Sequence, residues 1–476
     1  MKLLLAASEA VPYAKTGGLA DVAGALPGEL ARLGHDARLV MPRYAAVAQK
    51  LETVRSGLAV ELGGERAAFD LLCDKGGGYE AWFIDCPKYF DRPGLYGEKG
   101  SDYPDNAARF AFFAKALLAA AEAVGFIPDL IHSHDWQTAL VPLLLKKGNY
   151  PPFENTATLF TIHNLAYMGC FPPEEALPLV GLGDGIFAAE GGLEYHGKVN
   201  YLKAGLVFAD VLTTVSPTYA KEIQTPEFGY GLEGVLKSRT ADLFGVLNGI
   251  DYEAWNPATD PHLAANYSAE EPAGKALCKA ALQREYGLPE RPDAPLFGMV
   301  TRLADQKGLD LFEKAAGEFF APNLQFVLLG TGEPKYHALF DDLAAGFPEK
   351  CGVRLAYDAA LAQRIYAGSD LFLMPSRYEP CGLGQLIALA YGTVPVVRAT
   401  GGLADTIREG ENGFTFSDYL PGPFFGAVER ALAAYSDAET WAGLVERAFA
   451  ARYSWGRSAR RYVELYAEAR SKRRTA

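Results

Sequence analysis

Residues 371–405 contain two strand–loop–helix units in direct succession, and this arrangement constrains the fold more than any other part of the chain. The runs 371–375 and 394–399 have the apolar composition of buried parallel strands, and each leads through a glycine-containing loop into a helix. Ligands bind at the carboxyl ends of the strands in open parallel sheets, where glycine lets backbone N–H groups approach an anion closely. With Glu379 in the first loop, this stretch predicts a site for a ligand that carries both hydroxyl and phosphate groups.

The hexapeptide TGGLAD occurs twice, at 16–21 and at 400–405. The first copy follows the predicted strand 2–7, much as the second follows a strand near the other end of the chain. A chance match in a chain rich in Gly and Ala, or a duplication, are alternative explanations. Two helix starts that face an anion in two separate domains would produce the same repetition.

Alternation of strands and helices on both sides of residue 256 indicates an α/β protein with two Rossmann-like domains. A chain of 476 residues also exceeds what one hydrophobic core usually supports. We expect an antiparallel excursion at 59–85, a linker or surface loop at 256–274, and mainly helix after 420, ending in a solvated basic tail. The predicted elements are strands at 2–7, 37–42, 129–134, 156–164, 211–216, 245–251, 296–301, 324–330 and 353–358, helices at 19–33 and 107–124, and a helix starting at Trp136.

The net charge of −13 argues against nucleic acid or an anionic membrane as a partner and permits a neutral polysaccharide. Six cysteines without CxxC spacing favour reduced thiols in the cytoplasm over a disulfide framework or a zinc site. Ser8 and Glu9 end the N-terminal apolar run too early for a signal peptide. Lys115 and Glu122 interrupt the most apolar helix, so we expect no membrane span.

Arg302 and Lys307 are the cations best placed for an anionic ligand, because they follow the predicted strand 296–301 closely. Two cations at a strand end can neutralise a diphosphate whose negative charge grows as it leaves. The alternative is a solvated pair in a loop, and the glycine-led helix starts favour the phosphate interpretation. Lys15 can add a third charge, although a single lysine in a loop is usually solvated.

Several acids and histidines also follow predicted strands. Glu379 can accept two sugar hydroxyls or stabilise positive charge at a sugar C1, and the alternative is a surface acid. His163 can bond a sugar hydroxyl or pack in a polar loop, and Asp135 lies at a neighbouring strand end. His132, His134, Asp135 and His163 lack the spacing of metal ligands, so we expect no metal site. No GxSxG, Walker A or GxGxxG motif follows a strand, which disfavours hydrolase, kinase and dehydrogenase interpretations.

Taken in order, these segments resemble bacterial glycogen synthase and plant starch synthase, the glucosyltransferases that use ADP-glucose. The resemblance extends from about residue 1 to about residue 470, and KTGGL together with EPCGL is its most specific part. EPCGL-like motifs alone indicate only the wider set of retaining glycosyltransferases. The matching segments are KTGGL (15–19), HDW (134–136), TIHN (161–164), NGID (248–251), TRL (301–303), DQKG (305–308), EPCGL (379–383) and TGGL (400–403).

The resemblance implies two Rossmann-like domains that face a cleft. Residues 1–244 would form the acceptor-side domain, on which a C-terminal helix at about 459–476 packs, and residues 245–458 would bind the nucleotide sugar. The implied reaction transfers glucose from ADP-glucose to the non-reducing end of an α-1,4-glucan such as glycogen, with retention at the anomeric carbon and without a cofactor. No pair of carboxylates suited to a double displacement is evident, so we expect a front-face substitution.

Residue roles follow from the same resemblance. Arg302 and Lys307 would stabilise the leaving diphosphate, and Glu379 would bind glucose hydroxyls. The remaining implied contacts are Lys15, Gly17 and Gly18 at the distal phosphate or sugar, His163 and Asn248 at the glucose, Asp135 near the reacting centre, Tyr357 on the adenine, and the backbone of Cys381, Gly382, Leu383, Gly384, Thr400, Gly401 and Gly402 around phosphate or glucose.

Two positions depart from the family pattern. Gly384 stands where the family usually has Thr, and Met168 stands where Gln is common. Rival functions are a transferase or epimerase for another sugar nucleotide, and a glucan-binding protein without catalysis. A glucan-binding protein would not need the diphosphate charges of Lys15, Arg302 and Lys307.

Overall fold

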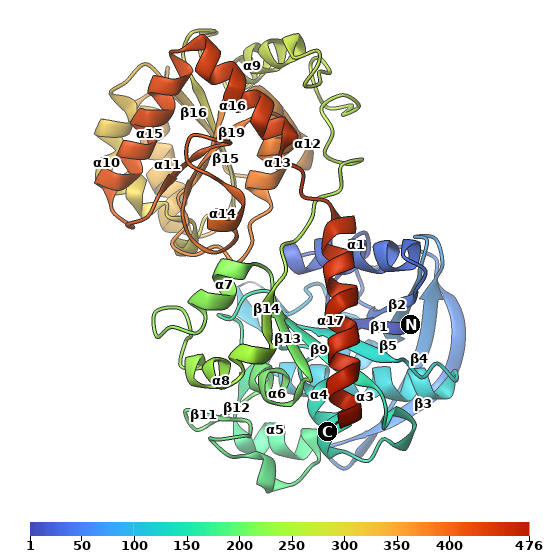
Figure 1. Ribbon diagram of the computed structural model, residues 1–476. Helices are drawn as coiled ribbons and strands as arrows, with labels where there is room; N and C mark the ends of the chain where they lie inside the picture. The colour runs from blue at the N-terminus through green and yellow to red at the C-terminus, as the bar shows by residue number, and fades with distance from the viewer. Residues whose placement is uncertain (99, 476) are drawn as a thin grey trace. The chain divides into compact units, whose positions relative to one another are not determined.

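A computed structural model describes residues 1–98 and 100–475 and divides the chain into two compact units (Figure 1). The first unit comprises Met1–Val215, Ala220–Val246 and the C-terminal segment 455–475, and the second comprises Ser216–Tyr219 and Leu247–Ser454. The chain therefore passes between the units near residues 246 and 454, where the sequence placed boundaries at 244 and 458. Residue 476, the end of the predicted C-terminal helix, lies outside the described residues.

The first unit is built on a sheet that has nine strands among the described residues. Seven neighbouring strands are parallel, and the last two, β4 and β3, join the edge antiparallel. The antiparallel excursion is thus confirmed, although it begins at Glu52 rather than at residue 59. In sheet order the strands are β14 (Leu243–Gly245), β13 (Val211–Thr214), β9 (Ala157–Ile162), β8 (Leu130–His134), β1 (Lys2–Ala6), β2 (Asp36–Pro42), β5 (Glu80–Asp85), β4 (Glu65–Asp74) and β3 (Glu52–Leu62).

Strand β1 lies at the point where the strand order reverses. It pairs with β2 on one side and with β8 on the other, with Leu3 opposite Ala37 and Leu130. In doubly wound sheets, ligands bind in the crevice at such a switch point, beyond the carboxyl ends of the strands. The loops after β1 and β8 therefore form the expected binding edge of this unit.

Helices cover the sheet of the first unit because its central strands are apolar on both faces. Helix α1 (Gly18–Arg32) buries Leu19, Leu26 and Leu30 and contains Pro27. The other helices of this part of the chain are α2 (Pro87–Phe90), α3 (Asn106–Ala123), α4 (Leu140–Lys147), α5 (Pro173–Val180), α6 (Tyr201–Phe208), α7 (Pro217–Glu222) and α8 (Glu233–Ser238), and the small strands are β6 (Gly97–Glu98), β7 (Ser101–Asp102), β10 (Cys170–Phe171), β11 (Glu194–Tyr195) and β12 (Lys198–Asn200).

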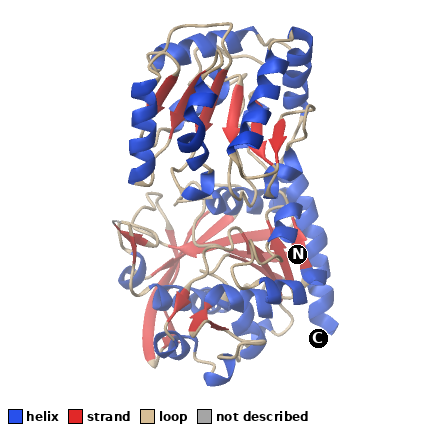
Figure 2. Cartoon of the chain, turned by 90° about the vertical axis from the view of Figure 1, so that its left-hand side faces the viewer, coloured by secondary structure: helices blue, strands red, loops and turns tan. Residues whose placement is uncertain are grey.

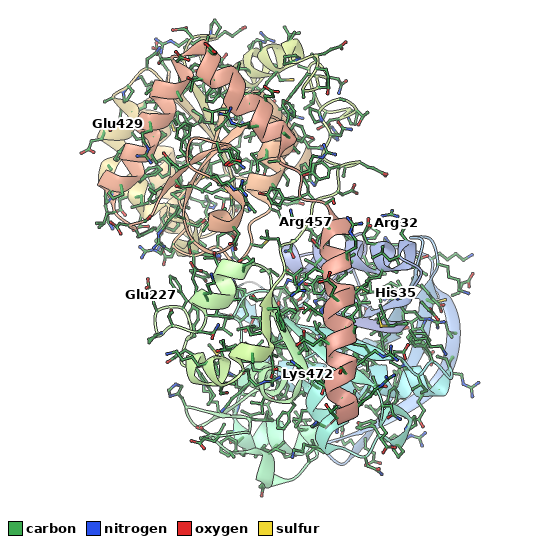
Figure 3. All side chains as sticks on the ribbon, in the orientation of Figure 1. Arg32, His35, Glu227, Glu429, Arg457 and Lys472 are labelled. Carbon is green, nitrogen blue, oxygen red and sulfur yellow. The ribbon has the colours of Figure 1, made fainter. Side chains whose placement is uncertain are left out.

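The last helix, α17 (Trp455–Thr475), packs in the first unit against α1 and β9 (Figure 1). The prediction of a solvated basic tail is wrong for Lys472 and Arg473, which bind partners in the first unit, whereas Arg474 is exposed as expected. Arg470 contacts Asp129 at 3.0 Å, and Lys472, labelled in Figure 3, contacts Asp242 at 2.6 Å. Arg473 also donates to the carbonyl of Leu145 in the last turn of α4 at 3.3 Å, which suits a cation at a helix C-terminus.

The second unit has one sheet of six parallel strands among the described residues, with helices on both faces (Figure 2). Strand order reverses beside β15, which pairs with β16 and with β18. In sheet order the strands are β17 (Cys351–Arg354), β16 (Gln325–Leu329), β15 (Leu296–Val300), β18 (Leu371–Met374), β19 (Val394–Arg398) and β20 (Phe414–Phe416). The helices are α9 (Ala273–Glu285), α10 (Asp310–Phe320), α11 (Pro334–Gly346), α12 (Ala359–Gly368), α13 (Gly384–Ala390), α14 (Gly401–Thr406), α15 (Pro421–Tyr435) and α16 (Ala438–Ala450).

Two Rossmann-like units are therefore confirmed, but three predicted elements are displaced. Trp136 begins a turn rather than a helix, because Thr138 Oγ donates to the carbonyl of His134 at 2.8 Å and α4 starts only at Leu140. The strand expected at 245–251 is the short edge strand β14, which ends at Gly245.

The strand expected at 353–358 ends at Arg354, and residues 355–358 form a loop after this edge strand. Strand β20 was not expected, since its three residues are too few to show a period. No helix within the described residues has the length and hydropathy needed to cross a bilayer.

Candidate functional site

Lys307 and Glu379 meet at the carboxyl edge of the second unit's sheet. Lys307 Nζ lies 2.6 Å from Glu379 Oε2, and Ser376 Oγ donates to the same oxygen at 3.0 Å. Their loops follow β15 and β18, the two strands at the switch point. Glu379 is only 6% exposed, so the paired ammonium group offsets the cost of a buried carboxylate.

The backbone of the two loops explains why they fit together. Gly308 has φ +74°, and a Cβ there would lie 2.0 Å from the carbonyl oxygen of Pro375. Gln306 reinforces the contact, since its Nε2 donates to the Tyr378 carbonyl at 3.2 Å and its own carbonyl accepts from Arg377 N–H at 2.8 Å. Only glycine at 308 allows this approach, which brings Lys307 to the site.

Arg302 lies next to this pair. Its side chain is exposed, and Nη2 is 3.3 Å from Gln306 Oε1. The second unit therefore brings together Arg302, Lys307 and Glu379, as the sequence predicted for three residues from separate motifs. Two guanidinium or ammonium groups beside one acid suit a ligand with a diphosphate and hydroxyl groups.

The loop at Thr400–Gly402 packs on the backbone of Glu379. A Cβ at Gly401, whose φ is +47°, would lie 2.0 Å from the Glu379 carbonyl oxygen. A Cβ at Gly402 would lie 2.1 Å from the Cys381 carbonyl oxygen. The N–H groups of Thr400 and Gly402 donate to the Arg398 and Glu379 carbonyls at 2.9 and 3.1 Å. Close packing alone therefore requires both glycines, and these two N–H groups are already used inside the unit.

The turn at Cys381–Gly384 is stabilised by hydrogen bonds from the neighbouring side chain of Gln385. Gly382 has φ +72°, and Gln385 Nε2 donates to the carbonyls of Cys381 and Gly382 at 3.0 and 2.9 Å. Leu383 packs against the core, and α13 begins at Gly384. A Cβ at Gly384 would lie 3.1 Å from the ring of Phe372, so a larger residue here needs its neighbours to move.

Asn248 and Tyr357 differ sharply in exposure. Asn248 is 5% exposed, and its Oδ1 has no hydrogen-bond partner among residues 1–98 and 100–475. Its backbone N–H faces the Cys381 thiol, whose pKa is raised to about 12 by burial. Cys381 is thus a neutral thiol and no nucleophile. Tyr357 is 85% exposed on the loop after β17.

Asp135 and His163 meet at the carboxyl edge of the first unit's sheet. The backbone N–H of His163 donates to Asp135 Oδ1 at 2.7 Å, and Asp135 adopts the left-handed φ of +55°. Burial raises the pKa of Asp135 to about 7, and the charge of Glu9 adds to this effect. Burial lowers the pKa of His163 to about 3, so its imidazole is neutral at neutral pH.

Two further histidines lie behind His163. His134 Nδ1 is 3.0 Å from His163 Nε2, while His132 contacts Thr161 Oγ at 2.6 Å and Tyr466 OH at 2.8 Å. These bonds use both ring nitrogens of His132 and one ring nitrogen each of His134 and His163. Within the described part of the chain, no group of three or more His, Cys, Asp or Glu is arranged to hold a metal ion.

The loop after β1 carries the remaining predicted residues and an acid that the sequence analysis missed. Lys15 Nζ pairs with Asp21 at 2.7 Å. Glu9, which is 4% exposed, accepts from Thr16 Oγ at 2.9 Å and from Gly17 N–H at 3.3 Å. Glu9 therefore holds the loop, and its position directly after a buried strand was the available signal.

Gly18 and Met168 are the last two positions in the first unit that the sequence analysis singled out. A Cβ at Gly18 would meet nothing within 4 Å, so no contact among the described residues requires glycine there. Met168 accepts a weak bond from Asn200 Nδ2 at its sulfur, 3.4 Å away, and its carbonyl accepts from Leu202 N–H at 3.0 Å. The thioether thus takes a structural contact that an amide side chain would also satisfy.

Comparison with known proteins agrees with this geometry. The model of the starch synthase catalytic domain matches residues 2–238, and the model of glycosyl transferases group 1 matches residues 284–442. Two such units, each with its polar loops at a switch point, define a glycosyltransferase of the two-Rossmann-domain class, the GT-B fold. The chain belongs to the glycogen and starch synthase family.

Full-length relatives support this assignment. The chain is 51% identical to the glycogen synthase of Syntrophotalea carbinolica and 50% identical to that of Anaeromyxobacter dehalogenans, over 98% of this chain and 99% of each relative. The catalytic domain of starch synthase IV from Arabidopsis thaliana, solved with ADP and acarbose, has a TM-score of 0.90 and 36% identity over 99% of both chains. Sucrose-phosphate synthase from Thermosynechococcus elongatus, at 18% identity and a TM-score of 0.61 over 98% of both chains, shares the fold.

Proposed function

We propose that this glycosyltransferase transfers glucose from ADP-glucose to the non-reducing end of an α-1,4-glucan, with retention of the anomeric configuration. The observation that carries the proposal is the Lys307–Glu379 pair, 2.6 Å apart, with Arg302 beside it at a switch point. The choice of ADP-glucose is supported by the ADP bound to the related plant starch synthase. Glycogen as the acceptor is supported by the names of the bacterial relatives.

The charges in the second unit suit a leaving diphosphate. A lysine ammonium has three donors, and Lys307 uses one on Glu379, so two are available for phosphate oxygens. Arg302 adds a planar guanidinium that can bind phosphate in a bidentate manner. Both groups bind the transition state more tightly than the ground state, because negative charge on the diphosphate grows as the glycosidic bond breaks.

Glu379 is proposed to hold the glucose. Its Oε2 accepts from Lys307 and Ser376, so sugar hydroxyls would meet Oε1. Asn248 offers a buried amide oxygen without a partner among the described residues, which suits a sugar hydroxyl as donor. Tyr357, at 85% exposure, provides a ring on which an adenine can stack.

The first unit is proposed to supply the remaining groups. His163 and Asp135 would contact the glucose and the reacting centre, and Lys15 and Gly18 would approach the distal phosphate or sugar. The open space at Gly18 supports close approach of a ligand. In a front-face substitution, the leaving phosphate oxygen takes the proton of the acceptor hydroxyl while the new bond forms on the same face. The free thiols of all six cysteines support a reducing compartment, the cytoplasm.

Turnover of three variants tests the roles in the second unit. Glu379→Gln keeps the shape of the side chain but removes its charge, and Lys307→Met removes the ammonium group. Each is expected to lose at least about 100-fold in kcat, the usual cost of one electrostatic group in a transition state. Lys314→Met, which removes an exposed lysine paired with Asp310 at 3.1 Å, is the control and should keep full turnover. Near-normal kcat in either site variant would show that its assigned role is wrong.

A further inference from the structure

His134 is fully buried behind His163 and makes one side-chain hydrogen bond. Its Nδ1 lies 3.0 Å from His163 Nε2, and its exposure is 0%. Its other ring nitrogen, Nε2, is buried and has no hydrogen-bond partner among residues 1–98 and 100–475. Burial lowers the pKa of both histidines, so each ring carries a single proton.

Two arrangements of these protons satisfy the bond between the rings. If His163 donates from Nε2, then His134 accepts at Nδ1 and must carry its own proton on Nε2. That proton would be a buried N–H donor without an acceptor, which is rare in folded proteins and costs the desolvation of the group. If His134 donates from Nδ1, its Nε2 has no proton, and no donor is left unpaired.

We infer that His134 is a positioning residue that donates its Nδ1–H to Nε2 of His163 and so holds His163 in the Nδ1–H tautomer. His163 then presents an N–H donor, and not a lone pair, to a hydroxyl oxygen of the sugar. The tautomer follows from the two rings alone, and its role in transfer rests on the proposed function. Sequence motifs gave no sign of this role, since His134 and His163 are 29 residues apart.

The surroundings hold this arrangement in place. The backbone N–H of His163 is fixed by Asp135 Oδ1 at 2.7 Å, and that of His134 by Thr138 Oγ at 2.7 Å. The ring of His134 also packs against the ring of His132 in a tilted arrangement, with ring centroids 4.0 Å apart. His163 is partly exposed while His134 is not, so only the outer ring is open to a ligand. Such rigid support keeps a donor within the small angular error that catalysis tolerates.

The tautomer can be measured directly by nitrogen NMR on the full chain labelled with ¹⁵N-histidine. The chain has seven histidines, and the His163→Gln variant identifies the resonances of His163. We expect a protonated Nδ1 and a bare Nε2 for His163, and the same pattern for His134. A protonated Nε2 on His163 in the native protein would overturn the inference. This measurement needs no substrate, so its result does not depend on the proposed function.

Two substitutions of His134 test the positioning role. His134→Asn places an amide N–H near the position of Nδ1, whereas His134→Phe keeps the ring volume and removes the donor. We expect kcat roughly ten-fold lower in the Phe variant, the value of about one hydrogen bond, and close to normal in the Asn variant.

The NMR spectrum of the Phe variant should show His163 leaving the pure Nδ1–H form. Normal kcat in the Phe variant, or no recovery in a folded Asn variant, would contradict the role. If native protein fails to transfer glucose from ADP-glucose, the proposed function fails while the tautomer assignment stands on the spectrum.

Discussion

Asp135 is predicted to destabilise the folded first unit at neutral and alkaline pH. Its pKa is raised from the ordinary 3.8 to about 7, mainly by burial, so the native state holds this proton more tightly than the unfolded chain does. The stabilisation that this proton gives the native state is at its full value below about pH 4. It is lost as the pH rises through 7, because Asp135 then loses the proton in the native state as well. A shift of this size corresponds to about 4 kcal/mol, and we expect about 2 kcal/mol because the side chain is partly exposed and water screens it.

The test is the Asp135→Asn variant. Asparagine keeps an oxygen for the His163 N–H, tolerates the left-handed φ of +55°, and carries no titratable group. Hydrogen exchange, followed by mass spectrometry on peptides from β8 and β9, gives the opening free energy of this region at each pH.

Between pH 4 and pH 8, the opening free energy of the variant should rise by about 2 kcal/mol relative to that of the native protein. The variant should also lose transfer activity. Asp184→Asn, which alters an exposed carboxylate of the same unit, is the control for general pH effects. A free-energy difference that stays constant with pH, or a variant that becomes relatively less stable toward pH 8, would refute the reasoning.

Three further outcomes follow from the packing and exposure of single residues. Gly401→Ala should lower the free energy of unfolding by about 2–3 kcal/mol and remove most activity, because its Cβ would clash at 2.0 Å with the backbone carbonyl of Glu379. Gly410→Ala, at φ +69° with nothing within 4 Å, is the control and should lower it by only about 1 kcal/mol, as measured by chemical denaturation. Tyr357→Ala should raise KM for ADP-glucose roughly ten-fold without changing Tm, and an unchanged KM would reject adenine stacking. Lys472→Met should lower the opening free energy of the first unit by about 0.5 kcal/mol, as measured by hydrogen exchange, because it removes the pair with Asp242. Arg474→Met, which alters an exposed side chain, is the control and should leave this free energy unchanged.

Period and composition were sufficient to predict the central elements. Strands such as β1 and β8 are buried on both faces, so they appear as short apolar runs, and the polar residues after them mark the binding edge. Arg302, Lys307 and Glu379 can be associated from the sequence because all three follow predicted strands of one parallel sheet. The ends of several elements and the lengths of the edge strands were predicted wrongly. The turn after Asp135 depends on a side-chain bond from Thr138, and the length of β14 depends on having a single neighbour.

Contacts between distant segments could not be read from a single sequence. The backbone at 401 and 402 is predicted to cradle phosphate or glucose, which stays a prediction, and the structure adds that both glycines pack against the loop of Glu379. The basic tail looked solvated because its partners, such as Asp129 and Asp242, lie more than two hundred residues away in the chain. Glu9 follows the first strand in the sequence, but its role as an acceptor for Thr16 and Gly17 depends on a loop that folds back over it.

Transfer of labelled glucose tests the central claim most directly. The native chain would be incubated with ADP-glucose or UDP-glucose labelled in the sugar, with and without glycogen, and both nucleotide release and label in the glucan would be counted. The account predicts ADP release that depends on glycogen and matches the label gained by the glucan, with loss of both in Glu379→Gln. Glycogen binding without release of either nucleotide would contradict it and would indicate a glucan-binding protein.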